Sequence, residues 1–152
     1  MTFPTGYLAD MNKVGSGEIH GGGHVILSSS SFADGLTIGR FAQLLAGVVS
    51  NMNNTATPNV LGVVKRMVSY ALEAGSNISA AYNSQIDYVT AGLVTVDAVA
   101  ETAPARGVKV YAYNGATLAD NGKVTATSGG NIDVAATFVQ VVSPNVWLVQ
   151  IK

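Results

Sequence analysis

The sequence predicts an all-β protein, a small β-sandwich or β-barrel of the jelly-roll type, preceded by an extended N-terminal arm. Short apolar segments rich in β-branched residues recur between turn residues, which is typical of such folds. Helical periodicity is confined to one ambiguous segment, and no internal repeat is visible. A chain of 152 residues is long enough to bury one core. We therefore expect an arm over residues 1–35 and a β-rich domain over residues 36–152.

The predicted arm differs in composition from the rest of the chain. It is rich in glycine, contains a run of four serines, and has one short apolar segment at residues 25–27. Turn and linker residues of this kind favour extended chain over a packed element. We expect the arm to lie along the surface of a partner.

The first part of the predicted domain carries a conflict between two periodicities. Residues 36–45 begin with the alternation of a strand, but the apolar residues between 41 and 52 also fit a helical stripe. Gly39 and Gly47 disfavour a helix. We expect a strand over residues 36–45 and leave residues 46–54 open.

Strand and turn signals alternate through the rest of the chain. A type I′ turn is predicted at Asn114-Gly115, and hairpin loops at Asn83-Ser84-Gln85 and Ser143-Pro144-Asn145. Residues 94–103 contain Asp97 and Glu101, either on one helical turn or at the end of a strand. The further strands are expected at residues 60–68, 78–82, 86–89, 108–113, 138–142 and 146–151.

Low charge is the most informative property of the composition. Charged residues make up 11% of the chain and the net charge is −1, whereas globular proteins average about 25% charged residues. A nearly neutral surface gives no field for a phosphate backbone, so no nucleic-acid partner is expected. Interface cores are depleted in Lys, Glu and Asp. We infer that partners cover much of this surface, with a monomer of low charge as the alternative.

Two further absences bound the class of protein. The chain contains no cysteine, which excludes disulfides and cysteine-based zinc sites. The first residues do not have the pattern of a signal peptide, and no apolar segment approaches the length needed to cross a bilayer. We expect a soluble protein made in the cytosol, with no membrane partner.

The segment Gly17–His24, GEIHGGGH, is the part of the chain that most resembles a binding site. It places Glu18, His20 and His24 around three glycines, but these glycines make a helix improbable, so the histidine spacing carries no defined geometry. The segment also lacks the third glycine of a dinucleotide-binding loop. No nucleophile elbow accompanies the two histidines. We expect no catalytic residues, no metal and no cofactor.

Arginines and aromatic residues leave two questions open. Arg40 and Arg66 lie in or beside apolar strand segments, where each forms either an ion pair between subunits or an ordinary edge-strand charge. The tyrosines and Trp147 lie within or beside predicted strands. They are either core and sheet-face residues or a platform on which sugars stack.

The order of several short motifs resembles that of a known family. The arm carries Gly6-Tyr7-Leu8-Ala9-Asp10, and the first strand region carries Ile38-Gly39-Arg40-Phe41. Three more motifs follow in sequence: Leu61-Gly62-Val63-Val64-Lys65-Arg66, then Tyr70 with Gly75 and Ile78, then Gly107-Val108-Lys109-Val110-Tyr111. A hydrophobic hairpin ends in Val149-Gln150-Ile151. In this order the chain resembles the capsid cement, or head decoration, proteins of tailed bacteriophages.

This resemblance implies a structural protein on the outer surface of the virion. Such proteins sit outside an HK97-type shell and clamp neighbouring major capsid subunits, commonly as oligomers with N-terminal arms spread over neighbours. The partners would be the major capsid protein and further copies of this chain, as trimers in preference to dimers. The expected interface residues are Phe3, Tyr7, Leu8, His20, His24, Arg40 and Arg66. The alternative is a carbohydrate-binding or fibre-type β module on the virion surface.

Overall fold

A computed structural model of the chain describes residues 17–65, 77–78 and 85–152, and the structural statements below concern these residues. The described part is built of strands, with one short 3-10 helix, η1, at Leu118–Asp120. The strands are β1 (Ile19–Ser29), β2 (Leu36–Thr37), β3 (Phe41–Leu45), β4 (Val48–Asn51), β5 (Asn59–Val64), β6 (Asn77–Ile78), β7 (Ile86–Asp97), β8 (Lys109–Ala112), β9 (Val124–Thr125), β10 (Ile132–Ser143) and β11 (Val146–Ile151).

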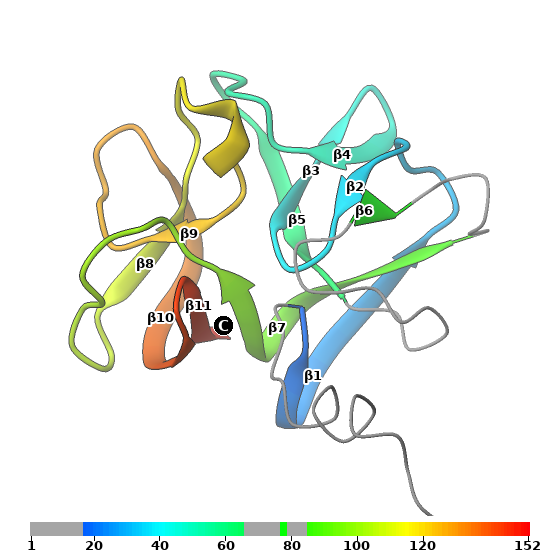
Figure 1. The fold of residues 1–152 in the computed structure, drawn as a ribbon. Helices are drawn as coiled ribbons and strands as arrows, with labels where there is room; N and C mark the ends of the chain where they lie inside the picture. Colours follow the sequence, from blue (N-terminus) through cyan, green and yellow to red (C-terminus); the bar gives the residue numbers. More distant parts are fainter. Residues whose placement is uncertain (1–16, 66–76, 79–84) are drawn as a thin grey trace, which may run out of the picture.

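One antiparallel sheet dominates the described residues and curls into a half-barrel (Figure 1). Its strand order is β4-β3-β5-β7-β11-β10-β8-β9, with β1 on the remaining edge of β7. β2 and β6 form a separate two-stranded ribbon. The all-β class predicted from the sequence is confirmed, and the barrel is open. None of the described helices is long and apolar enough to cross a membrane.

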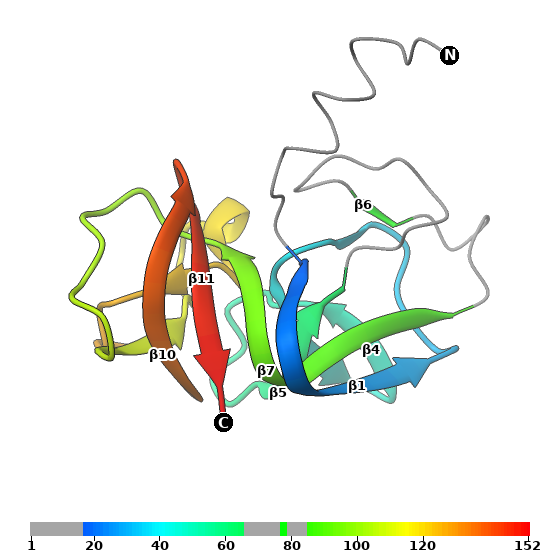
Figure 2. The same ribbon diagram turned by 90° about the horizontal axis from the view of Figure 1, so that it is seen from below.

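β7 connects the two wings of the half-barrel. Along one edge its first half pairs with β5, through Val63↔Val89 and Val64↔Tyr88, and its second half pairs with β11. Along the other edge it pairs with β1 from Ile86 to Val94, on both sides of a register shift. Figure 2 shows β1 following β7, while β10 and β11 lie to one side and β4 and β5 to the other.

The bend of β7 is located at Gly92. Its φ of +113° is in the region that disfavours side chains, and a Cβ built there would lie 2.6 Å from the Cβ of His24. β1 accommodates this crossing with register shifts between His20 and Val25, where its three consecutive glycines lie. Glycine at position 92 therefore allows β1 to stay paired with β7 on both sides of the bend.

Two apolar clusters fill the two wings. The larger lies under β7, β10 and β11, where Phe138 and Trp147 meet edge-to-face with ring centroids 5.3 Å apart. The smaller joins β2 to β3, β4, β5 and the start of β7. Its buried members are Leu36, Ile38, Ala42, Val49, Val64 and Ile86.

The described part of the predicted arm is extended, but it lies along this chain's own β7 rather than free of the domain. Ile19 and Ile26 pack against the larger cluster. Consequently the three consecutive glycines are part of a bulged strand. The boundary at residue 35 stays a prediction.

The ambiguous region after residue 36 forms two strands and a hairpin. The expected strand over residues 36–45 is interrupted at Ile38–Arg40, where Gly39 has φ +77°. The residues left open contain β4, and positive φ at both Ala46 and Gly47 makes the turn from β3 to β4. This turn excludes the alternative helix.

Other expected strands are present with shifted limits. β8 lies within the segment predicted for it, and β5 begins one residue before its predicted segment. β10 and β11 form the predicted C-terminal hairpin around Pro144-Asn145. β7 is longer than predicted, because residues 86–89 and 94–97 belong to one strand. Residues 83 and 84 of the predicted turn, and most of the predicted strand 78–82, lie outside the described residues.

The type I′ turn predicted at Asn114-Gly115 is wrong. Neither residue has a positive φ, and the chain continues through η1 before returning as β9. The polar groups of Asn114 form other bonds: its N–H donates to Asn131 Oδ1, and its Nδ2 donates to the Thr55 carbonyl. These long-range bonds outweigh the local turn preference.

We expect Gly92→Ala to destabilise the protein by at least about 2 kcal/mol, since it combines an unfavourable φ with a clash against β1. Urea unfolding measures the change. Gly22→Ala is the matched control from the same crossing, because a Cβ there meets nothing within 4 Å. Its expected effect is within about 0.5 kcal/mol. Equal losses in the two variants would contradict the role assigned to Gly92.

Candidate interaction surfaces

His20 and His24 lie where β1 crosses β7. His20 is the register partner of Leu93, and His24 rests on Gly92. His20 Nε2 and His24 Nδ1 are shielded from water and have no hydrogen-bond partner among the described residues. The side chains are half-buried at this crossing, so the structure gives them a packing role.

Glu18, the carboxylate of the same segment, is held by its backbone. Its N–H donates to Thr95 Oγ1, and its carbonyl accepts from the Thr95 N–H at 2.9 Å. No group of three or more metal-ligating side chains occurs among the described residues. The histidine spacing coincides with the register shift of β1 against β7.

Arg40 forms an ion pair within the chain. Its Nε lies 3.3 Å from Asp97 Oδ2, and its Nη1 donates to the Ala119 carbonyl. Both side chains are largely buried, at 21% and 14% exposed. The pair joins the β2–β3 turn to the end of β7 and to η1. The sequence left two alternatives for Arg40, an ion pair between subunits or an ordinary edge-strand charge. The structure shows a third arrangement, an ion pair within the chain.

Four of the predicted interface residues lie outside the described residues: Phe3, Tyr7, Leu8 and Arg66. The described tyrosines, Tyr88, Tyr111 and Tyr113, are half-buried. Tyr88 packs against the smaller apolar cluster, and the Lys109 ammonium lies 5.7 Å from the centre of the Tyr111 ring. These environments match the sheet-face interpretation of the tyrosines.

Several apolar side chains are exposed on the described surface. They lie on β1, at the β3–β4 turn, before β8, on η1 and near the end of β10. They are therefore distributed over several parts of the described surface. They are Val25, Leu27, Leu44, Leu45, Val108, Leu118 and Val141.

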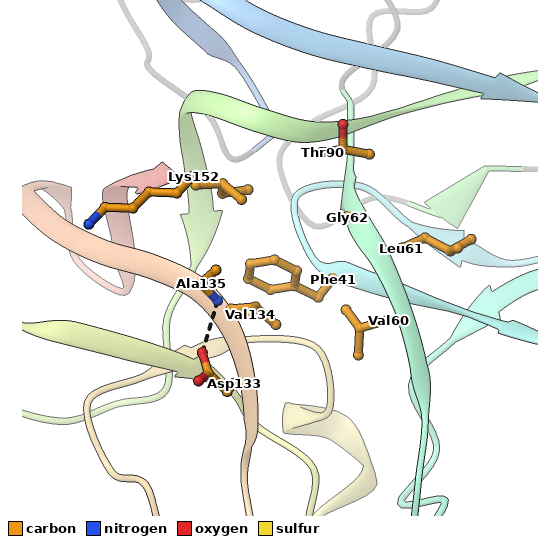
Figure 3. Close-up of a pocket in the computed structure, with 10 residues that line it drawn as sticks. Phe41, Val60, Leu61, Gly62, Thr90, Asp133, Val134, Ala135 and Lys152 are labelled. Carbon is orange, nitrogen blue, oxygen red and sulfur yellow. Dashed lines mark hydrogen bonds between the residues drawn. The ribbon is translucent and has the colours of Figure 1, made fainter.

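A groove between β5 and β10 is a concave feature that the sequence did not predict. It is open, has a volume of about 470 Å³, and its lining includes Val60, Leu61, Val134, Ile151 and the buried Phe41 (Figure 3). β5 and β11 pair with successive stretches of one edge of β7. Beside the bend of β7, β5 therefore diverges from β10, the strand that pairs with β11. Sequence patterns predict strands but not where two strands diverge, and thus carried no signal for this groove.

The β10 wall of the groove has an irregular backbone. Ala135 has φ +53°, and the register of β10 against β8 shifts between Asp133 and Ala136. Asp133 Oδ1 accepts a hydrogen bond from the Ala135 N–H, which supports this bulge. The Ala135 carbonyl accepts from the N–H of Lys152, so the last residue is fixed beside the groove.

Lys109 neutralises Asp133 at this wall. Its ammonium donates to Asp133 Oδ2, and this bond raises the pKa of Lys109 above its ordinary value. The same bond, followed by the bond from the Ala135 N–H, lowers the pKa of Asp133. Lys152 lines the groove and is present in no ion pair found among the described residues.

Comparison with known proteins now adds to this geometry. A family model described as the XM1 gp53 minor capsid protein matches residues 10–152. This chain belongs to that family. A minor capsid protein is a structural component of the phage virion, which agrees with the all-β, low-charge chain described above.

A solved structure supports the same relationship over nearly the whole chain. The chain is similar to a protein in "The capsid of Myoviridae Phage XM1", with 29% sequence identity and a TM-score of 0.78. The similarity covers 91% of this chain and 92% of the other. No curated protein sequence matches the chain.

We expect Arg40→Met to lower the free energy of unfolding of this minor capsid protein by about 1–3 kcal/mol, since it leaves the Asp97 carboxylate without its cation. Urea unfolding at several protein concentrations measures the loss. An intramolecular pair predicts the same loss at every concentration, whereas a loss that grows on dilution would indicate a pair between subunits. Arg106→Met, at an exposed position, is the control.

Lys109→Met should raise the pKa of Asp133 toward its ordinary value, because the variant removes the principal bond that stabilises the carboxylate. Since the folded pKa of Asp133 lies below the unfolded one, its contribution to stability is complete above the unfolded pKa. It is lost as the pH falls through the folded pKa. NMR titration of the carboxyl group measures the change. Lys123→Met, beside Asp120, should leave Asp133 unaffected.

Proposed function

We propose that the protein is a capsid decoration, or cement, protein. It binds the outer surface of an HK97-type phage capsid and stabilises contacts between major capsid protein subunits. The observation that carries this proposal is the family match over residues 10–152. The structural similarity to a chain of a phage capsid supports it over the same length.

Surface chemistry supports a role that depends on contact rather than catalysis. Charged residues are few, and exposed apolar side chains occur on several elements of the described surface. A surface of this kind is stabilised by partners that exclude water from it. Many copies, each making modest contacts on one shell, add up to a large stabilisation.

The fold supports the proposal mechanically. Both edges of β7 are paired, and the C-terminal hairpin of β10 and β11 is held in the same sheet. Long-range hydrogen bonds tie the loops to one another, for example Asn114 to Thr55 and Glu101 to Ala126. A small sheet tied in this way resists deformation, which suits a protein that holds neighbouring subunits together.

The proposed partners are the major capsid protein and further copies of this chain, with a trimer preferred to a dimer. Phe3, Tyr7 and Leu8 are the proposed contacts of the N-terminal segment, because they are apolar residues in a chain of low charge. His20, His24, Arg40 and Arg66 remain proposed contacts of the domain. For His24 and Arg40 the contact would add to the intramolecular roles described above.

Purified protein should bind saturably to capsids that lack it and raise the temperature at which the shell disassembles. Sedimentation of the mixed particles measures binding, and calorimetry measures shell stability. Tyr7→Ser combined with Leu8→Ser should weaken binding at least about tenfold, because two apolar contacts are lost.

Val108→Ser, an exposed apolar position in the β domain, is the control for this pair of substitutions. Absence of binding to such capsids would contradict the cement role. Saturable binding to a glycan array that depends on the tyrosines would instead support the carbohydrate-binding alternative.

A further inference from the structure

We propose that the groove between β5 and β10 receives residues 7–11 of a second copy of this chain, which lie there as a short added strand. The inference deepens the proposed function, because it names a contact between copies. Its test uses the isolated protein, so its failure is distinguishable from a failure to bind capsids.

The walls of the groove are two strand edges without partners. β5 pairs with β7 only through Val63 and Val64, and β10 pairs with β11 only from Ala136 onward. Among the described residues, no strand pairs with 59–61 or with 132–134 on the sides that face the groove. Unpaired strand edges are templates for an extended segment, which gains backbone hydrogen bonds there.

The surface between these edges is apolar. In Figure 3, Val134 on the β10 wall and Val60 on the β5 wall lie beside the ring of Phe41. Val60, Leu61 and Val134 are half-buried, so an added strand would remove further apolar area from water. The fitting occupant is therefore an extended segment with apolar side chains.

Residues 7–11, Tyr-Leu-Ala-Asp-Met, have this chemistry. They contain neither proline nor glycine, whereas Pro4, Gly6 and Gly15 interrupt the sequence on either side. A strand of this length spans roughly 16 Å, comparable with the short unpaired edges. Asp10 is the one acidic residue in the sequence before Gly17, and the cationic residue Lys152 lines the groove.

A second copy is favoured because of where the chain enters the sheet. The Gly17 N–H donates to the Thr95 carbonyl, and β1 then follows the edge of β7 opposite to β5 and β11. The groove lies on the β5 and β11 side. The chain's own residues 7–11 would have to pass around β7 within residues 12–17, whose full reach is about 20 Å. The same residues of a neighbouring copy are not subject to this restriction.

Cysteine crosslinking in the full-length chain tests this proposal, since the natural sequence contains no cysteine. Isotopically labelled Leu8→Cys protein is mixed with unlabelled Val134→Cys protein and oxidised mildly. Mass spectrometry should find a disulfide between position 8 of labelled chains and position 134 of unlabelled chains. The yield should exceed that of a matched control at least about tenfold, because the two positions are held at a high effective concentration.

The control is Val141→Cys, which lies exposed on the same strand away from the groove lining. Val60→Cys, from the β5 wall, repeats the test if Val134→Cys does not fold. Yields no higher than the control would overturn the proposal. So would exclusively intrachain disulfides in the double variant Leu8→Cys/Val134→Cys, because they would place the segment in its own groove.

Discussion

The close crossing of β1 and β7 at Gly92 governs the rest of the structure. β7 pairs with β5 and then with β11 along one edge, while β1 pairs along the other edge. A bend is needed where the partners change, and a side chain at the bend would overlap His24. Glycine in β7 and a glycine-rich bulge in β1 meet this requirement together. The curl, the two apolar clusters and the groove all follow from the bend.

The same crossing gives the most conspicuous sequence segment a structural role. Two histidines and a glutamate beside glycines form a pattern that, on a helix, places ligands on one face. In the bulged strand β1, the glycines allow its backbone to approach that of β7, and the histidines pack where the two strands cross. The low charge of the surface is then the more informative property. It agrees with the family match to a minor capsid protein, because the cores of protein interfaces are depleted in charged residues.

The class of fold was predictable because strand alternation and turn residues are local signals, as in the β10–β11 hairpin. Prediction failed where distant partners decide the conformation. Asn114-Gly115 is a strong local turn signal, but bonds from Asn114 to Thr55 and Asn131 hold another conformation. An arginine in an apolar segment was expected to have a partner. Asp97 is distant from Arg40 in the sequence, so the folded sheet is needed to show that these two side chains meet. The groove had no sequence signal, because it arises from the divergence of β5 and β10.

An open half-barrel is a costly arrangement for an isolated domain, because its wings leave strand edges exposed between them. Charged side chains are a common protection of such edges, yet Lys109 neutralises the one carboxylate of this groove wall, Asp133. What remains is an apolar, nearly neutral gap beside a lysine. Such a gap is expected where the folded domain is one part of an assembly, since the partner strand then completes the sheet. The unpaired strand edges and the apolar gap thus weaken the isolated half-barrel, but they would favour its association with other subunits of a capsid.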